Sequence, residues 1–196
     1  MKCDVILAGV GGQGVLSVAA IIAQAAVKDG LEVRQSEVHG MAQRGGAVLA
    51  HLRIADGSIA SDLVPRGGAD LILSMEPLES LRYAAWLSPK PAAGRPGAMV
   101  SAAEPLVNIP NYPDIKEIIK TIESFPLGRV VEAASLAKEA GLGKSVNMVM
   151  VGAASAFLPI KADTLEVTIK ETFIKKGQAT LEANIKAFNL GRNAVK

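Results

Sequence analysis

Residues 9–14 constrain the fold more than any other segment of the chain. They read GVGGQG and end an apolar run from Cys3 to Val10 that is typical of a buried β-strand. After Gly14, apolar side chains recur at helical spacing until Asp29-Gly30, which is a helix-ending signal. A strand, a glycine-rich turn and a helix in this order predict an α/β fold.

The rest of the chain fits a single domain, 1–196, with a Rossmann-like, mostly parallel sheet flanked by helices and followed by C-terminal helices. Hydrophobic residues make up 49% of the chain but aromatic residues only 4%. The core is therefore expected to consist of Ala, Val, Ile and Leu, which suits strands buried on both faces. We expect an edge hairpin in which Asp56-Gly57 turns the strand Ala47 to Ile54 back on Ser58 to Ser61.

Charge and hydropathy narrow the classes of partner. The 21 Lys and Arg residues are interspersed with 19 Asp and Glu residues, so nucleic acid is not an expected partner. The longest apolar run, Val146 to Pro159, is too short to span a bilayer, which needs about 20 residues. The first residues enter a strand at once, without a signal peptide. We therefore expect a cytoplasmic protein with no membrane partner.

The glycine-rich turn is the first candidate site. Its amides and the following helix N-terminus can receive a phosphate or carboxylate, although a tight turn that merely needs glycine explains the pattern equally well. The candidate ligand-edge or interface residues here are Gly9, Gly11, Gly12, Gln13 and Gly14. A dinucleotide site also needs an acidic residue at the end of the second strand. Gln35 stands near that position and Glu37 follows two residues later, which weakens this alternative.

A second candidate site follows the second strand, which we expect from Leu31 to Val38. Its candidate residues are Glu37, His39, Gln43 and Arg44, set among three glycines in residues 37–46. Arg44 offers a fork of donors and His39 titrates near neutrality, so an anion or proton site is one interpretation. A loop made rigid by its own polar side chains is the other. A right-handed crossover would bring this loop beside the glycine-rich turn at the carboxyl edge of the sheet.

A complete catalytic apparatus is missing from the sequence. The chain has no Gly-Asp-Gly motif of the kind that opens a thiamine diphosphate site, and its two histidines are too few for a metal cage. Its single cysteine, Cys3, cannot ligate an iron–sulfur cluster alone. We expect His51 to be structural, and we expect Ser135 and Asn147 to cap the helices that follow them.

With these motifs in view, the chain resembles the gamma-type module of the 2-oxoacid:ferredoxin oxidoreductases. The resemblance rests on residues 9–14, on residues 36–46 with their His-Gly-Met-Ala-Gln-Arg-Gly-Gly sequence, and on Asn147 to Ala153. It spans nearly the whole chain, and the His39 to Gly46 segment is most similar to the small subunit of the indolepyruvate-specific enzymes.

The resemblance implies a division of labour. Thiamine diphosphate, magnesium and iron–sulfur clusters would belong to a large catalytic partner subunit, and this chain would bind none of them alone. Coenzyme A would be a co-substrate, and electrons would pass to ferredoxin through the complex. The reaction would convert an aryl pyruvate to an acyl-CoA. A free-standing dinucleotide-dependent oxidoreductase and a non-catalytic binding module remain as alternatives.

Overall fold

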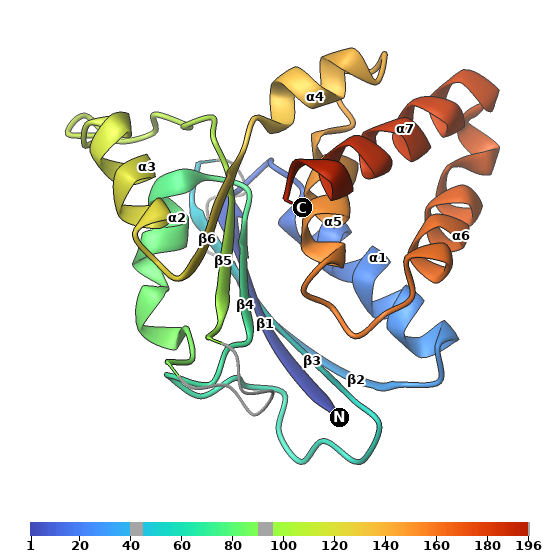
Figure 1. Ribbon diagram of the computed structural model, residues 1–196, viewed down its shortest axis with the longest axis horizontal. Coiled ribbons are helices and arrows are strands. Elements are labelled where there is room, and N and C mark those ends of the chain that lie inside the picture. Colours follow the sequence, from blue (N-terminus) through green and yellow to red (C-terminus); the bar gives the residue numbers. More distant parts are fainter. Residues whose placement is uncertain (40–44, 90–95, 196) are drawn as a thin grey trace.

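The computed structural model describes residues 1–39, 45–89 and 96–195, and within them a six-stranded sheet forms the centre of the molecule (Figure 1). The strands are β1 (Lys2–Val10), β2 (Glu32–His39), β3 (Ala47–Ala55), β4 (Leu71–Ser74), β5 (Ala98–Ala102) and β6 (Leu127–Val131). Their order is β2-β3-β1-β4-β5-β6. β3 is antiparallel to both neighbours, while β1, β4, β5 and β6 pair in parallel. The expected mostly parallel α/β fold is confirmed.

Helices cover both faces of the sheet (Figure 1). They are α1 (Val15–Lys28), α2 (Pro77–Arg82), α3 (Ile115–Glu123), α4 (Ala133–Glu139), α5 (Val146–Ser155), α6 (Ala162–Phe173) and α7 (Gln178–Ala194), with short 3-10 helices η1 (Ala84–Trp86) and η2 (Ile174–Lys176). One apolar core lies between the sheet and α1, α5, α6 and α7, and a smaller one lies beneath α2 and α3. Both are built mainly from aliphatic side chains, as the composition predicts.

Two glycines let α5 and α7 approach each other closely. A Cβ atom on Gly152 of α5 would lie 2.0 Å from the carbonyl oxygen of Phe188. A Cβ atom on Gly191 of α7 would lie 1.9 Å from the carbonyl oxygen of Val149. Any larger side chain at either position would push the helices apart. Phe188 on α7 is buried, with only 1% of its surface exposed.

The order of the strands corrects one expectation. The segment after α1 forms a strand as expected, but β2 does not lie beside β1, because β3 is inserted between them and pairs with both. Residues 58–61 form no strand, so the expected hairpin from Asp56-Gly57 is wrong. The edge hairpin consists of β2 and β3 instead. Both flanks of β3 are already occupied, which leaves Ser58 to Ser61 no strand to pair with.

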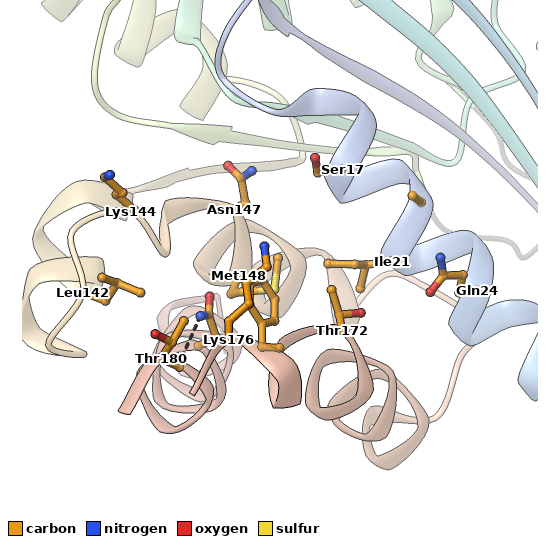
Figure 2. A pocket seen from close by; sticks show the side chains of 13 residues that line it. Ser17, Ile21, Gln24, Leu142, Lys144, Asn147, Met148, Thr172, Lys176 and Thr180 are labelled. Atoms are coloured by element: carbon orange, nitrogen blue, oxygen red, sulfur yellow. Dashed lines mark hydrogen bonds between the residues drawn. The ribbon is translucent and has the colours of Figure 1, made fainter. Parts of the chain in front are cut away.

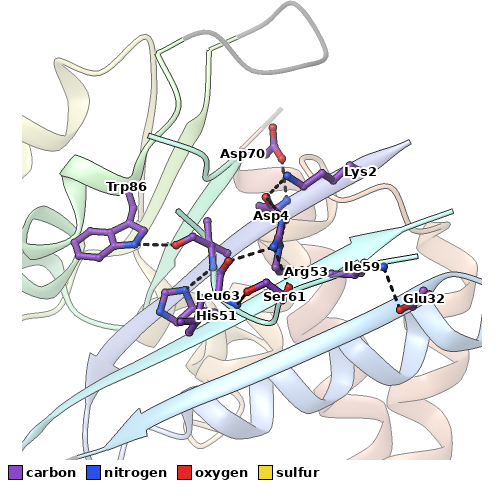
Figure 3. A network of polar contacts seen from close by, with 11 residues as sticks. Lys2, Asp4, Glu32, His51, Arg53, Ile59, Ser61, Leu63, Asp70 and Trp86 are labelled. Carbon is purple, nitrogen blue, oxygen red and sulfur yellow. Dashed lines mark hydrogen bonds and ion pairs between the residues drawn. The ribbon is translucent and has the colours of Figure 1, made fainter. Parts of the chain in front are cut away.

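Residues 58–64 run across the sheet as an irregular segment that side chains hold in place (Figure 3). Arg53 on β3 donates to the carbonyl oxygens of Ser61 and Leu63 at 2.9 and 3.2 Å, and it also forms an ion pair with the buried Asp4. His51 accepts a hydrogen bond from the Val64 amide through Nδ1 at 3.1 Å. The buried charges of this face thus serve a structural network.

Two expected helix caps are wrong. α4 begins at Ala133, before Ser135, and its Ala134 amide donates to the Glu104 carboxylate at 2.6 Å. α5 begins at Val146, so Asn147 lies inside its first turn. In both cases the helix extends further toward its N-terminus than the local cap signal indicates, because tertiary contacts hold the first turn. Within the described residues, no helix is long and apolar enough to cross a membrane.

Candidate functional site

The glycine turn, residues 9–14, connects β1 to α1 at the carboxyl edge of the sheet. Gln13 holds its shape: the side-chain oxygen accepts from the Val10 amide at 2.8 Å, and the side-chain nitrogen donates to the Met75 carbonyl at 3.0 Å. Gly9 is closely packed, since a Cβ atom there would lie within 3.1 Å of Val15, Gln13 and Met75. Gln13 therefore joins the ends of β1 and β4.

Gly14 ends the turn in the left-handed conformation, with φ at 78°, and precedes the first residue of α1. Gly14 packs against α5, since a Cβ atom on Gly14 would lie 2.3 Å from Nδ2 of Asn147. That nitrogen donates to the Gly14 carbonyl over a long 3.5 Å contact. Among the residues that the structure describes, no side chain forms a capping hydrogen bond at the N-terminus of α1.

The described end of the second candidate segment lies against this turn. The Gly11 amide donates to the Gly46 carbonyl at 2.7 Å, and the Gly45 amide donates to the Gly11 carbonyl at 3.3 Å. Asn108, from the segment after β5, donates to the Gly45 carbonyl at 2.7 Å. The two glycine-rich segments are therefore side by side.

The four polar candidates of the second segment are placed less completely. Glu37 is exposed on β2. His39 ends β2, but its side chain lies outside the described part of the structure, as do Gln43 and Arg44 entirely. The proposed anion or proton role of the last three residues thus stays a prediction from the sequence.

A cluster of hydrogen bonds around Glu76 lies at the same carboxyl edge of the sheet, after β4. Glu76 follows β4 and caps α2 by accepting from the Glu79 amide at 2.8 Å. Its second carboxylate oxygen accepts from the Leu106 amide at 3.3 Å and from the hydroxyl of Tyr112. Burial and this hydrogen bond to Glu76 raise the pKa of Tyr112, so the phenol stays protonated. Glu76, only 1% exposed, thereby fixes the segment that carries Asn108.

A cavity of about 430 Å³, here called the turn cavity, opens between the glycine turn and the ends of β4 and β5. Its lining residues are Gly12, Gln13, Gly14, Met75, Ala102, Glu104, Ala134, Lys144, Val146 and Asn147. The helices that follow β1 and β4, α1 and α2, cover opposite faces of the sheet (Figure 1). Open α/β sheets bind their ligands at such a switch point. The turn cavity is thus the candidate ligand site of this fold.

The chemistry of the lining is limited. Lys144 is the one basic side chain of this lining and Glu104 the one acidic side chain, and the Ala134 amide already occupies a Glu104 oxygen. Among the described residues, no three His, Cys, Asp or Glu side chains gather in a way that could hold a metal ion. The turn cavity can receive an anionic group beside Lys144 and the α1 N-terminus.

The strand order also bears on the dinucleotide alternative. In a dinucleotide-binding sheet, the acidic residue for the ribose ends a strand next to the first strand. Here Glu37 pairs with Ala50 of β3, and Ala50 pairs with Leu7 of β1, so Glu37 is two strands away from β1. Two strand spacings amount to about 9–10 Å. The geometry that a bound ribose requires is therefore not formed.

Sequence reasoning missed several residues of this edge. No motif marks Glu76, Glu104, Lys144 or Asn108. One signal was available for Glu76, because Pro77 follows it and proline is common at the first position of a helix, which makes Glu76 the residue in the N-cap position. Glu104 lies two residues after the end of the buried strand β5. Lys144 and Asn108 reach the site only through long-range packing.

Comparison with known proteins places the chain in a family. Residues 4–194 match the family described as "Pyruvate ferredoxin/flavodoxin oxidoreductase". Indolepyruvate oxidoreductase subunit IorB of Archaeoglobus fulgidus is 36% identical over 98% of this chain and 95% of its own length. The protein of the same description from Pyrococcus horikoshii is also 36% identical, over 98% of this chain and 96% of its own length.

Solved structures share the fold. A keto/oxoacid ferredoxin oxidoreductase gamma subunit from Geobacter sulfurreducens has a TM-score of 0.68 and 23% identity, covering 98% of both chains. A 2-oxoglutarate:ferredoxin oxidoreductase chain from Magnetococcus marinus has a TM-score of 0.75 and 24% identity. It covers 99% of this chain, which spans only 31% of that longer chain. On the family match and the identity to full-length relatives, this chain belongs to the pyruvate ferredoxin/flavodoxin oxidoreductase family.

Proposed function

We propose that this chain is the small subunit of an indolepyruvate:ferredoxin oxidoreductase. The main support for the proposal is the difference in sequence identity between two groups of relatives. Four indolepyruvate oxidoreductase subunits are 34–36% identical to this chain, whereas four 2-oxoglutarate synthase subunits of the same family are 25–29% identical. The proposed overall reaction is the oxidative decarboxylation of an aryl pyruvate to an acyl-CoA, with electrons passed to ferredoxin.

The proposal assigns thiamine diphosphate, magnesium and iron–sulfur clusters to a large partner subunit. The residues of this chain do not fit these groups. Its sequence lacks Gly-Asp-Gly, its one cysteine is buried in β1, and the residues that the structure describes form no metal-ligand cluster. We therefore assign no step of decarboxylation or electron transfer to its side chains.

The contribution we propose for this chain is to complete the coenzyme A edge of the active site. The turn cavity lies at the switch point of the sheet, and the N-terminus of α1 and Lys144 favour an anionic group there. In this proposal the face formed by the glycine turn, Gly45–Gly46 and Asn108 packs against the large subunit. Exposed Val107 and Ile109 flank Asn108 and would be covered by that contact. We place the complex in the cytoplasm.

Co-purification with an assay tests the proposal. A large subunit that carries a thiamine motif is expressed with this chain, and the complex is assayed for ferredoxin reduction with indolepyruvate or 2-oxoglutarate, with and without coenzyme A. We expect a stable complex that needs coenzyme A and prefers indolepyruvate. Preference for 2-oxoglutarate would refute the substrate assignment. Tight NAD(P)H binding by this chain alone would favour the free-standing dinucleotide enzyme.

A further inference from the structure

A second cavity, here called the helix cavity, opens within the helical layer. It shares only Lys144 and Asn147 with the turn cavity, and the proposed function does not use its other lining residues. Its volume is about 600 Å³, inside the range of roughly 300–1,000 Å³ that is typical of small-molecule pockets. Its walls come from α1, the start of α5, the end of α6 with η2, and α7 (Figure 2). Elements far apart in the sequence thus line one cavity that is open to solvent on one side and lies next to the main core.

The floor of the helix cavity is apolar and firmly packed. Ile21 of α1 and Met148 of α5 are 5% and 2% exposed and belong to the main core. Phe173, at the end of α6, adds an aromatic ring that is partly buried against the same core. A ring-sized apolar body placed there would contact side chains that are held in position by the core, so the site is preformed.

The charged side chains that line the helix cavity are all positive. Its lining contains Lys144 and Lys176 and no Asp or Glu. Neither lysine forms an ion pair with another residue in the described part of the chain. Lys176 is instead held over the Phe173 ring, with Nζ 5.2 Å from the ring centroid. Both lysines are exposed, and with one of them beside an aromatic ring and no carboxylate in the lining, the cavity favours an anionic ligand.

Polar side chains complete the lining. Asn184 of α7 is only 2% exposed, and its amide nitrogen donates to the Thr180 carbonyl at 2.7 Å, which fixes the orientation of the amide. Ser17 and Gln24 of α1 add further hydrogen-bonding groups at the rim. A mostly apolar pocket with a few fixed polar groups and a lysine is the arrangement expected for an amphipathic small molecule.

We propose that the helix cavity binds a small amphipathic anion, that is, a ring-sized apolar body with one carboxylate or phosphate group. The apolar body lies against Ile21, Met148 and Phe173, and the anionic group is bound by Lys176. Because Lys144 and Asn147 line both this cavity and the turn cavity, an occupant also contacts the helix turn that packs on Gly14. This inference stands independently of the indolepyruvate assignment.

Calorimetry on the full chain tests the proposal without any activity assay. The probes are indole-3-acetate, its neutral analogue indole-3-ethanol, inorganic phosphate and coenzyme A. We expect one site, at which an amphipathic anion binds about ten-fold or more tightly than the neutral analogue, equivalent to about 1.4 kcal/mol. Binding of indole-3-acetate that Ala20→Phe abolishes identifies a carboxylate ligand of the helix cavity. Binding of coenzyme A identifies a phosphate-bearing ligand of this cavity only where Ala20→Phe abolishes it, because binding that survives this substitution belongs to the turn cavity.

Variants locate the binding. Lys176→Met should abolish the preference for the anion, and Ala20→Phe, which fills the cavity from α1, should abolish binding altogether. Lys120→Met on α3, which covers the opposite face of the sheet, is the charge-matched control and should change nothing. Thermal unfolding checks that each variant folds. Equal binding of indole-3-ethanol, equal binding of phosphate alone, unchanged binding in both cavity variants, or no binding of any probe would each overturn the proposal.

Discussion

Asn147 on α5 occupies the space in which a side chain on Gly14 would stand. Its Nδ2 atom would be 2.3 Å from a Cβ on Gly14, and Gly14 itself has φ at 78°. The start of α5 and the glycine turn are therefore fitted to each other through one missing side chain. This contact joins the motif nearest the N-terminus to a residue 133 positions away.

Gly14→Ala should destabilise the protein by more than its backbone conformation alone requires. An L-residue in the left-handed region costs about 1–2 kcal/mol, and the clash with Asn147 adds to this cost. Gly30→Ala is the matched control, because Gly30 has φ at 79° and nothing within 4 Å of its Cβ position. Urea unfolding of both variants measures the difference. Equal losses of stability in the two variants would show that the contact with Asn147 does not contribute to the effect.

The glycines between α5 and α7 give a second prediction. Gly152→Ala places a Cβ 2.0 Å from the Phe188 carbonyl oxygen, so the helices must separate, and we expect a loss of about 1–3 kcal/mol or more from overpacking. Gly143→Ala is the control, since its Cβ would meet nothing nearer than 4.0 Å and its φ is ordinary. Thermal unfolding should show a large drop for the first variant and almost none for the second. A small drop for Gly152→Ala would contradict the close helix packing.

The sequence pattern predicted the helices and strands better than it predicted which strands lie side by side in the sheet. The strand–turn–helix beginning, the buried strands and the C-terminal helices follow from local periodicity, and the structure confirms them. The insertion of β3 between β1 and β2 was not predicted, because the alternation of Ala47 to Ile54 fixes which side chains are buried but not which strand lies alongside. The cap expected at Asn147 failed for a related reason. Its contact with Gly14 comes from tertiary packing.

His51 should make the stability depend on pH. Burial lowers its pKa below the ordinary 6.5, helped by Arg53 and opposed by Asp62. The neutral ring is needed, because Nδ1 accepts the Val64 amide. The folded state binds the proton more weakly than the unfolded state, so this stability is fully present above pH 6.5 and is lost as the pH falls through the folded-state pKa.

His51→Gln removes this titration. Unfolding by urea between about pH 7.5 and pH 5 should show a smaller loss of stability in the variant than in the wild type. His39 is present in both proteins and cancels in the comparison. The same pH dependence in both would assign the effect to other groups.

Arg44 carries a prediction that rests on the sequence. Because the described end of its segment, Gly45–Gly46, hydrogen-bonds to Gly11, we expect Arg44 to serve the assembled active site. Arg44→Ala should lower the turnover of the assembled enzyme more than it lowers the thermal stability of the free subunit. Arg34→Ala, on the exposed side of β2, should change turnover little. Lost stability with unchanged turnover would make Arg44 a structural residue.

The sequence predicted only part of the candidate site. The glycine turn and its neighbour Gly45–Gly46 were predicted to meet, and their hydrogen bonds confirm this. The expectation that Gln13 lies at a ligand edge or interface stays a prediction, and the sequence did not indicate that its side chain joins the ends of β1 and β4. The carboxylates of Glu76 and Glu104 bind amides from segments 30 residues away, and no local pattern encodes such contacts.

Titration of the large subunit with this chain tests the central claim most directly. Ferredoxin reduction is followed with indolepyruvate and coenzyme A at a fixed amount of large subunit, while this chain is added in steps. We predict negligible activity of either protein alone and a rate that rises with added chain until it saturates at a fixed molar ratio. Full activity of the large subunit without this chain, or of this chain without the large subunit, would contradict the account.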